Sequence, residues 1–225
     1  MGPGRGERIE LSAKVLANWV SKAGNALQDE YDLGPGSVIR LSLPPHWRAL
    51  YWAMAAWSVG ATVDLAGGRS ADLLICDDEG LAATVDPAPV DPAPGEVVLV
   101  TLGALARAHP GPVPSGAMDE ARELATYGDQ FVAVAGAAPD DLALIVDGAQ
   151  TPYRCVVPHR DWPASTRVSL AGDLAQVLQS SLAAWAVDGS VLLSRNGQRA
   201  GGEPQPGRLA SERVTLDLAQ GATGS

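Results

Sequence analysis

The chain has two cysteines and two lysines among its 225 residues, and both shortages restrict its chemistry. Cys76 and Cys155 lie far apart, without CxxC spacing and without histidines at metal-ligand intervals. This pattern excludes the usual zinc motifs and a disulfide framework, so we expect two buried or half-buried free thiols and no bound metal. Because Lys14 and Lys22 are the only lysines, cationic chemistry must fall largely to arginine.

Excess positive charge and long apolar runs are also missing. The formal net charge is −10, whereas proteins that bind nucleic acids or anionic membranes use patches of lysine and arginine. No run of about 18 apolar residues occurs, and residues 1–7 lead into polar sequence rather than into an apolar secretory core. We therefore expect a soluble, cytoplasmic protein with no nucleic-acid partner and no membrane contact.

The remaining pattern is that of a globular α/β protein. Hydrophobic residues make up 46% and charged residues 19% of the chain, which indicates one compact core rather than disorder. Apolar runs predict strands at 38–43, 61–65, 72–76, 97–102, 142–146 and 190–194. Helical spacing predicts helices after Ser12, between Pro45 and Gly60, at 117–126 and at 170–186. This alternation predicts a layered domain with a mostly parallel sheet flanked by helices.

Common catalytic motifs are absent from the sequence, including the phosphate-binding GxxxxGK[ST], GxSxG and HExxH. His46 and His109 are isolated. A triad of His159, Asp161 and a serine is disfavoured, because Asp161 follows His159 too closely to orient its imidazole in the usual way. The acidic pairs at 77–78, 119–120 and 140–141 are interpreted as solvated charges in turns or at helix starts. We predict no catalytic residue.

Two stretches nevertheless resemble the adenylate-forming (AMP-binding) superfamily, which includes acyl-CoA synthetases, nonribosomal peptide adenylation domains and firefly luciferase. The motifs occur in the family's order: Leu16-Ala17-Asn18-Trp19, Leu33-Gly34-Pro35-Gly36 and Val59-Gly60-Ala61 within residues 9–65, then Asp140-Asp141-Leu142-Ala143, Val156-Val157-Pro158-His159-Arg160 and Leu182-Ala183-Ala184-Trp185. The resemblance covers residues 9–195. It implies the fold of the family's N-terminal subdomain and a place among short bacterial relatives of these enzymes.

The sequence departs from the family at the phosphate loop. There the pattern Ser-Gly-Thr-Thr-Gly-x-Pro-Lys-Gly surrounds the phosphates of ATP with amides and hydroxyls, and its lysine neutralises them. Residues 147–155 form a shorter loop that keeps one hydroxyl, at Thr151, and an arginine, Arg154, near the place of the lysine. Asp147 repels an anion by on the order of 1 kcal/mol. Cys155 replaces a glycine whose lack of a side chain lets the backbone approach phosphate.

The family's later motifs, its hinge and its C-terminal domain with the catalytic lysine have no counterpart in these 225 residues. We therefore expect no autonomous adenylate formation. The favoured hypothesis is a catalytically inactive binding or interaction module with a protein partner or with self-association. Six tryptophans fit either an interface or the core. An active acyl-adenylate ligase is disfavoured, and a non-adenylating enzyme has no motif to support it.

The alternative hypothesis is a small-molecule binder at the changed phosphate loop. Its site would comprise Gly148, Gln150, Thr151, Arg154 and His159, at the carboxyl end of the sheet, where α/β proteins place ligands. The ligand would be a nucleotide, an acyl-CoA fragment or another anion, so ATP, AMP and CoA are the cofactors to test, although none is expected.

The expected organisation of the chain is a single domain with flexible ends. Residues 1–8 are predicted to be a flexible N-terminus and residues 9–195 to be one α/β domain. This domain carries a proline-rich loop at 86–96. Residues 196–225 are predicted to form a loop and a C-terminal segment.

Overall fold

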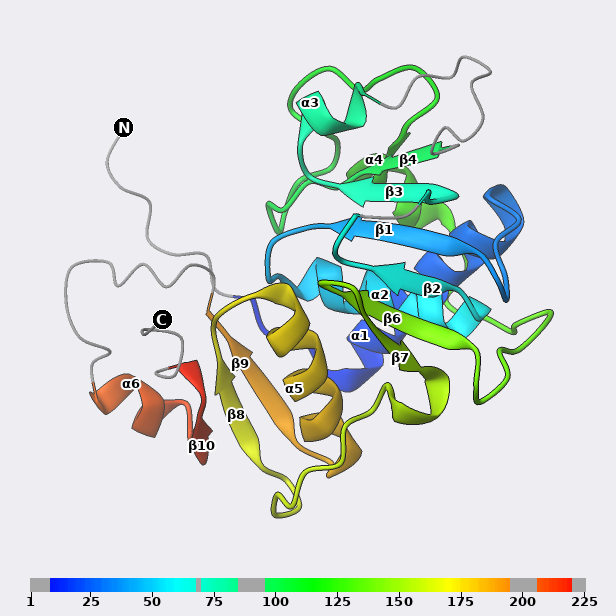
Figure 1. The fold of residues 1–225 in the computed structure, drawn as a ribbon. Coiled ribbons are helices and arrows are strands. Elements are labelled where there is room, and N and C mark those ends of the chain that lie inside the picture. The colour runs from blue at the N-terminus through cyan, green and yellow to red at the C-terminus, as the bar shows by residue number, and fades with distance from the viewer. Residues whose placement is uncertain (1–8, 68–69, 85–95, 195–205, 220–225) are drawn as a thin grey trace.

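The structure is a computed structural model that describes residues 9–67, 70–84, 96–194 and 206–219 (Figure 1). The strands are β1 (Val38–Ser42), β2 (Thr62–Asp64), β3 (Leu73–Cys76), β4 (Glu96–Leu99), β5 (Met118–Asp119), β6 (Leu142–Val146), β7 (Ala149–Pro152), β8 (Arg167–Leu170), β9 (Ser190–Leu193) and β10 (Leu216–Asp217). The helices are α1 (Ala13–Asn25), α2 (Trp47–Val59), α3 (Glu79–Ala82), α4 (Glu120–Glu123), α5 (Leu174–Ala186) and α6 (Pro206–Ser211). Short irregular helices are η1 (Ala26–Glu30), η2 (Leu124–Thr126) and η3 (Tyr153–Cys155).

Two sheets organise the described part of the chain. The larger has the strand order β5-β4-β3-β1-β2-β6-β7, and the smaller has the order β10-β8-β9. Every neighbouring pair is parallel except β6 and β7, which form an antiparallel hairpin. The predicted fold class, a mostly parallel sheet flanked by helices, is therefore confirmed.

The unit β1-α2-β2 shows how local sequence sets this topology. The imidazole of His46 accepts a hydrogen bond from the backbone N–H of Arg48 and so caps the start of α2. Gly60 ends the helix in the left-handed conformation, with φ at 90°. The chain then returns to pair β2 in parallel with β1, with Val38 beside Thr62. The predicted strand-helix-strand unit is confirmed.

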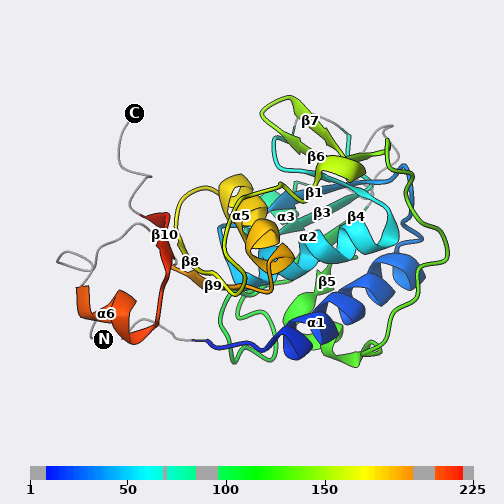
Figure 2. The ribbon, with the colours of Figure 1, turned by 90° about the horizontal axis from the view of Figure 1, so that it is seen from below.

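The two faces of the large sheet are covered differently (Figure 2). Alternate side chains of β1 and β3, including Leu41 and Ile75, join the main core with α1 and α2. The opposite side chains, including Leu74 and Cys76, pack in a second cluster against α3. Helix α2 follows β1 and α3 follows β3, so the connections from these neighbouring strands leave towards opposite faces.

Some predicted elements differ from the structure. The helix predicted at 170–186 begins only at Leu174, because β8 occupies the preceding residues 167–170. The helix predicted at 117–126 is a short strand, one helical turn and a 3-10 turn. Residues 206–219, expected as loop and terminal segment, contain α6 and β10. Residues 1–8 and most of the proline-rich loop expected at 86–96 lie outside the described residues.

The six tryptophans serve mainly as packing. Trp52 is fully buried and the other five are partly buried against the main core. The rings of Trp19, Trp47 and Tyr51 lie within about 6 Å of one another, in edge and stacked contacts. This arrangement favours the core interpretation of the tryptophans over the interface interpretation.

No helix within the described residues is long and apolar enough to cross a membrane.

Candidate functional site

The segment that resembles the phosphate loop is a tight β-hairpin. Strand β6 turns directly into β7, with Val146 paired to Ala149 across a two-residue turn. The turn residues Asp147 and Gly148 both have positive φ, 47° and 82°. This combination is typical of a type I′ turn, and Asp-Gly is one of its preferred sequences. Part of the predicted loop is therefore a strand, because an Asp-Gly turn closes the hairpin immediately.

The backbone amides beyond the turn are already engaged. Tyr153 N donates to Asp141 O at 2.9 Å, and Arg154 N donates to Pro139 O at 3.0 Å. Val156 N donates to Tyr153 O at 3.2 Å. A phosphate cradle needs several amides directed at one anion. Two of these amides, next to the expected lysine position, instead hold η3 against the segment that precedes β6, and the third closes the turn of η3 itself.

The predicted site residues lie on different elements. Gly148 is in the exposed turn, and Gln150 and Thr151 are successive residues of β7, so their side chains leave opposite faces of the sheet. Arg154 lies in η3, and its guanidinium forms an ion pair with Asp140, both side chains being more than half exposed. His159 is exposed in irregular chain. Within the described part of the chain, no hydrogen bond or ion pair joins these five residues to one another, and a ligand site on them remains a prediction.

Tyr153 explains why η3 is fixed in place. Its hydroxyl donates to Ala61 O at 2.7 Å and so ties η3 to the loop before β2. Burial raises the pKa of the Tyr153 phenol above its ordinary value of 10.0, and Asp141 raises it further. The phenol therefore stays protonated and remains a donor at neutral pH.

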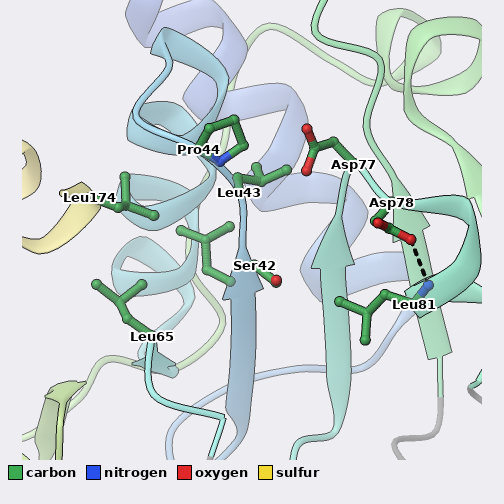
Figure 3. A pocket seen from close by; sticks show the side chains of 9 residues that line it. Ser42, Leu43, Pro44, Leu65, Asp77, Asp78, Leu81 and Leu174 are labelled. Carbon is green, nitrogen blue, oxygen red and sulfur yellow. Dashed lines mark hydrogen bonds between the residues drawn. The ribbon is translucent and has the colours of Figure 1, made fainter. Parts of the chain in front are cut away.

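A second feature is a pocket of about 410 Å³ at the carboxyl ends of β1, β2 and β3 (Figure 3). Its polar lining comprises Ser42 at the end of β1 and Asp77 and Asp78 just after β3. Its apolar lining comprises Leu41, Leu43, Pro44, Leu65, Leu81 and Leu174. The volume falls within the range of small-molecule sites, roughly 300–1,000 Å³.

This pocket occupies the topological switch point of the large sheet. From β1 the chain crosses to β2 on one side, whereas β3 and then β4 lie on the other side of β1. The connections after β1 and β3 leave towards opposite faces of the sheet, and this divergence opens a crevice between them. Open α/β sheets bind ligands in the crevice at this position. Sequence reasoning placed a ligand at the carboxyl end of the sheet but on the hairpin, and missed this crevice.

Sequence reasoning also missed a buried polar cluster at the carboxyl ends of β4 and β5. Asp119 and Glu120 are buried, so their interpretation as solvated charges is wrong. Glu120 accepts hydrogen bonds from the guanidinium of Arg48 and from the hydroxyl of Tyr51, while Arg48 also donates to Gly103 O at 3.3 Å. Burial raises the pKa of the Glu120 carboxyl, against the opposing effect of Arg48. The cluster fixes α2 to the segment after β4.

The thiols and carboxylates provide no metal centre in the described residues, where no three potential ligands gather. Cys76 is buried and Cys155 is exposed, and both are free. The exposure of Cys155 differs from the expected burial, because η3 lies at the surface.

Comparisons with known proteins place the fold. No protein-family model matches the chain. A curated protein of Mycobacterium tuberculosis (strain ATCC 25618 / H37Rv), described only by a numbered family, is 40% identical over 130 residues, which are 56% of this chain and 51% of that protein. The chain spans about half the length of this curated relative.

Solved structures give the same scaffold. An acyl-CoA synthetase from Brucella canis superposes with a TM-score of 0.66 at 18% identity, over 92% of this chain and 42% of that chain. The inhibitor-bound N-terminal domain of FACL13 from M. tuberculosis superposes with a TM-score of 0.68 at 11% identity, over 90% of this chain and 54% of that chain. An artificially fused adenylation-PCP di-domain NRPS from Klebsiella oxytoca superposes with a TM-score of 0.63 at 14% identity, over 95% of this chain and 40% of that chain. The chain therefore has the fold of the N-terminal part of adenylate-forming enzymes, as the resemblance implied.

Proposed function

We propose that the chain is a binding module that uses the scaffold of adenylate-forming enzymes without forming adenylates itself. The β6-β7 hairpin is the observation that supports this proposal most strongly. Adenylation requires a positive, amide-rich cradle that stabilises the phosphates and the charge that develops during attack. At the corresponding place the chain has an exposed carboxylate, Asp147, and amides that already pair with carbonyls.

The pocket at the switch point supports the binding part of the proposal. It combines apolar walls with a few polar groups, which is the usual composition of a small-molecule site. The hairpin offers no comparable enclosure, since Gly148, Gln150 and Arg154 are all exposed. Ligand binding is therefore proposed at the carboxyl ends of β1 and β3 rather than at the hairpin.

Exchange of radiolabelled pyrophosphate into ATP tests the catalytic part. The purified chain should give no exchange with acetate, longer fatty acids or benzoate, while an active acyl-CoA synthetase assayed in parallel should give a clear signal. Exchange that depends on a carboxylic acid would refute the proposal.

A melting experiment tests the hairpin as a ligand site. On this proposal, millimolar ATP, AMP or CoA should leave the melting temperature of the chain unchanged. A shift that disappears in Arg154→Ala but persists in Arg160→Ala would restore the alternative hypothesis of an anion site on the hairpin. Arg160 is a suitable control because it is an exposed arginine that follows the same segment.

A second candidate function, self-association, has one specific observation in its favour. Val132 and Val134 are 82% and 86% exposed, although Asn25 and Gln28 of the first helical segment hold the backbone around them. The two valines lie two positions apart in one exposed segment, and both present apolar surface to solvent. Analytical ultracentrifugation over a range of concentrations tests self-association. A dimer of the chain should dissociate more readily when both valines are changed to serine. A chain that sediments as a monomer at every concentration would rule self-association out.

A further inference from the structure

We propose that His109 and Glu79 form a pH-sensitive latch, which holds α3 in place when the imidazole of His109 is protonated and releases it when the imidazole is neutral. The latch stands on its own geometry. Its effect on ligand binding rests on the binding function proposed above, because Leu81 of α3 lines the pocket at the switch point.

The imidazole of His109 is held in place by its backbone. His109 precedes Pro110-Gly111-Pro112, a turn in which each proline fixes its own φ. The backbone N–H of His109 donates to both carboxylate oxygens of the buried Asp119, at 3.1 and 3.0 Å. The side chain of His109 is 6% exposed. A proton that binds this ring must therefore be accommodated by the groups around it rather than by bulk water.

The Nδ1 atom of His109 lies next to two groups that require opposite protonation states. It accepts a hydrogen bond from Gly111 N at 3.2 Å, for which Nδ1 must carry a lone pair. The same atom lies 3.7 Å from Oε1 of Glu79, the first residue of α3. A carboxylate only accepts hydrogen bonds, so Glu79 pairs with Nδ1 only when Nδ1 carries a proton. The neutral and the protonated ring therefore have different partners.

Gly111 allows the carboxylate of Glu79 to come this close. A Cβ at residue 111 would overlap Oε1 of Glu79 and would lie 2.8 Å from its Cδ. The carboxylate thus rests against the backbone of the glycine, beside the imidazole. An alanine at this position would displace the carboxylate and would leave both ionisable groups in the chain, so Gly111→Ala separates the geometry of the latch from its chemistry.

The imidazole is the member of this cluster whose type ordinarily changes charge near neutral pH. The charged groups on the elements around it are Asp78 and Glu79 at the start of α3, Asp119 of β5, Arg122 and Glu123 of α4, and Arg107 in the preceding segment. Carboxylates ordinarily stay ionised down to about pH 5 and arginine stays protonated, whereas histidine changes charge between about pH 5 and pH 8. Acidification from pH 7.5 to pH 5.5 therefore acts on the imidazole.

Protonation exchanges one hydrogen bond for a stronger one. The ring loses the hydrogen bond from Gly111 N and gains one to the carboxylate of Glu79. Charge-assisted hydrogen bonds of this kind are about twice as strong as neutral ones. The added stability is present while the imidazole is charged, at the acidic end, and it is lost as the pH rises and the proton leaves. The latch thus closes on acidification.

The latch acts on the pocket through α3. This helix is a single turn, in which Glu79 O accepts the backbone N–H of Ala83 at 2.9 Å. A contact that holds the first residue therefore holds the whole turn. Leu81, in the same turn, belongs to the lining of the pocket, as Figure 3 shows. A closed latch therefore restricts the motion of this wall of the pocket.

Nuclear magnetic resonance on the isotope-labelled chain between pH 7.5 and pH 5.5 tests the latch. The amide proton of Gly111 should shift upfield along the same titration curve as the ring of His109, because it loses its acceptor. The rate of water exchange at the amide of Ala83, divided by the intrinsic rate at each pH, should fall about threefold to fivefold on acidification. A Gly111 amide that ignores the titration of His109, or an Ala83 amide equally protected at both pH values, would overturn the proposal.

Variants assign the effect to the two partners. Glu79→Gln, Gly111→Ala and His109→Gln should each remove most of the change in Ala83 protection. His159→Gln removes an exposed imidazole outside the latch and should leave the change as it is. A Gly111→Ala variant that keeps the full change contradicts the pairing. Circular dichroism melts at both pH values confirm that each variant folds.

The outcomes separate this inference from the proposed function. If Gly111 and Ala83 respond as expected but the chain catalyses pyrophosphate exchange, the proposal of an inactive binding module fails and the latch stands. If exchange is absent and α3 ignores the pH, the latch is overturned and the absence of adenylation stands. The methyl resonances of Leu81 report the link to the pocket: they should follow the titration of His109, and static methyl resonances would overturn that link.

Discussion

The buried pair of Arg48 and Glu120 gives the sharpest prediction about stability. Arg48 is 3% and Glu120 is 1% exposed, and the carboxylate also accepts the hydroxyl of Tyr51. Replacing Glu120 with alanine leaves the guanidinium of Arg48 buried without its counter-charge. The variant should therefore unfold far more readily than a variant in a surface pair.

The structure sets the size of this effect. Removing one partner of a buried ion pair costs about 3–5 kcal/mol, because the remaining charge stays desolvated. For a chain of this size, each kcal/mol lowers the melting temperature by about 2–4 °C, which gives a decrease of about 6–20 °C. Replacing both partners, as in Arg48→Met with Glu120→Leu, should cost much less than the sum of the single changes, because no buried charge remains.

Urea denaturation followed by tryptophan fluorescence measures these differences. The control is Asp129→Ala, which removes an exposed carboxylate, 59% exposed, from its pair with Lys22 and should cost less than about 1 kcal/mol. A loss below about 1 kcal/mol for Glu120→Ala, or single changes that add without coupling, would refute the reasoning that this pair is desolvated.

Other predictions follow from the thiols and from two glycines. Ellman's reagent should modify one thiol in the folded chain at pH 8, and Cys155→Ser should abolish that reaction, because Cys76 is buried. Burial raises the pKa of the Cys76 thiol from 9.0 to about 11. The protonated thiol should therefore stabilise the folded chain fully below pH 9, and this stabilisation should be lost as the pH rises through 11. Cys76→Ala should reduce the alkaline loss of stability measured in urea titrations. Gly60→Ala should cost more than Gly36→Ala in the same assay, by about 1 kcal/mol or more. Both glycines have positive φ, but a Cβ at Gly60 would lie 2.8 Å from Pro35, whereas one at Gly36 meets nothing within 4 Å.

Local pattern was enough to predict most of the large sheet. The β1-α2-β2 unit is recognisable because its apolar strand, its helical spacing and Gly60 all act within a few residues of one another. The hairpin was recognisable too, since Asp147-Gly148 is a strong turn signal between two strand-forming segments. The resemblance to a phosphate loop predicts a single loop over residues 147–155, whereas the Asp-Gly turn closes a hairpin within them.

Long-range contacts set the limit of sequence reasoning. Glu120 looks like a solvated charge because its partner Arg48 lies 72 positions earlier in the chain. Likewise, the pocket depends on which strands become neighbours: β3 pairs with β1 rather than with β2, and this choice places Asp77 beside Leu43 and Pro44. A short strand such as β8 is hard to separate from the helix that follows, because both are apolar.

The most direct test of the central claim is a titration of the isotope-labelled chain with ATP and magnesium, followed through the backbone amide resonances. The claim is that the hairpin holds no phosphate, because the amides of Tyr153, Arg154 and Val156 are already paired within the chain. The account predicts that the resonances of residues 147–156 stay unchanged at millimolar ATP. Saturable shifts confined to Gly148, Thr151 and Arg154 would contradict it.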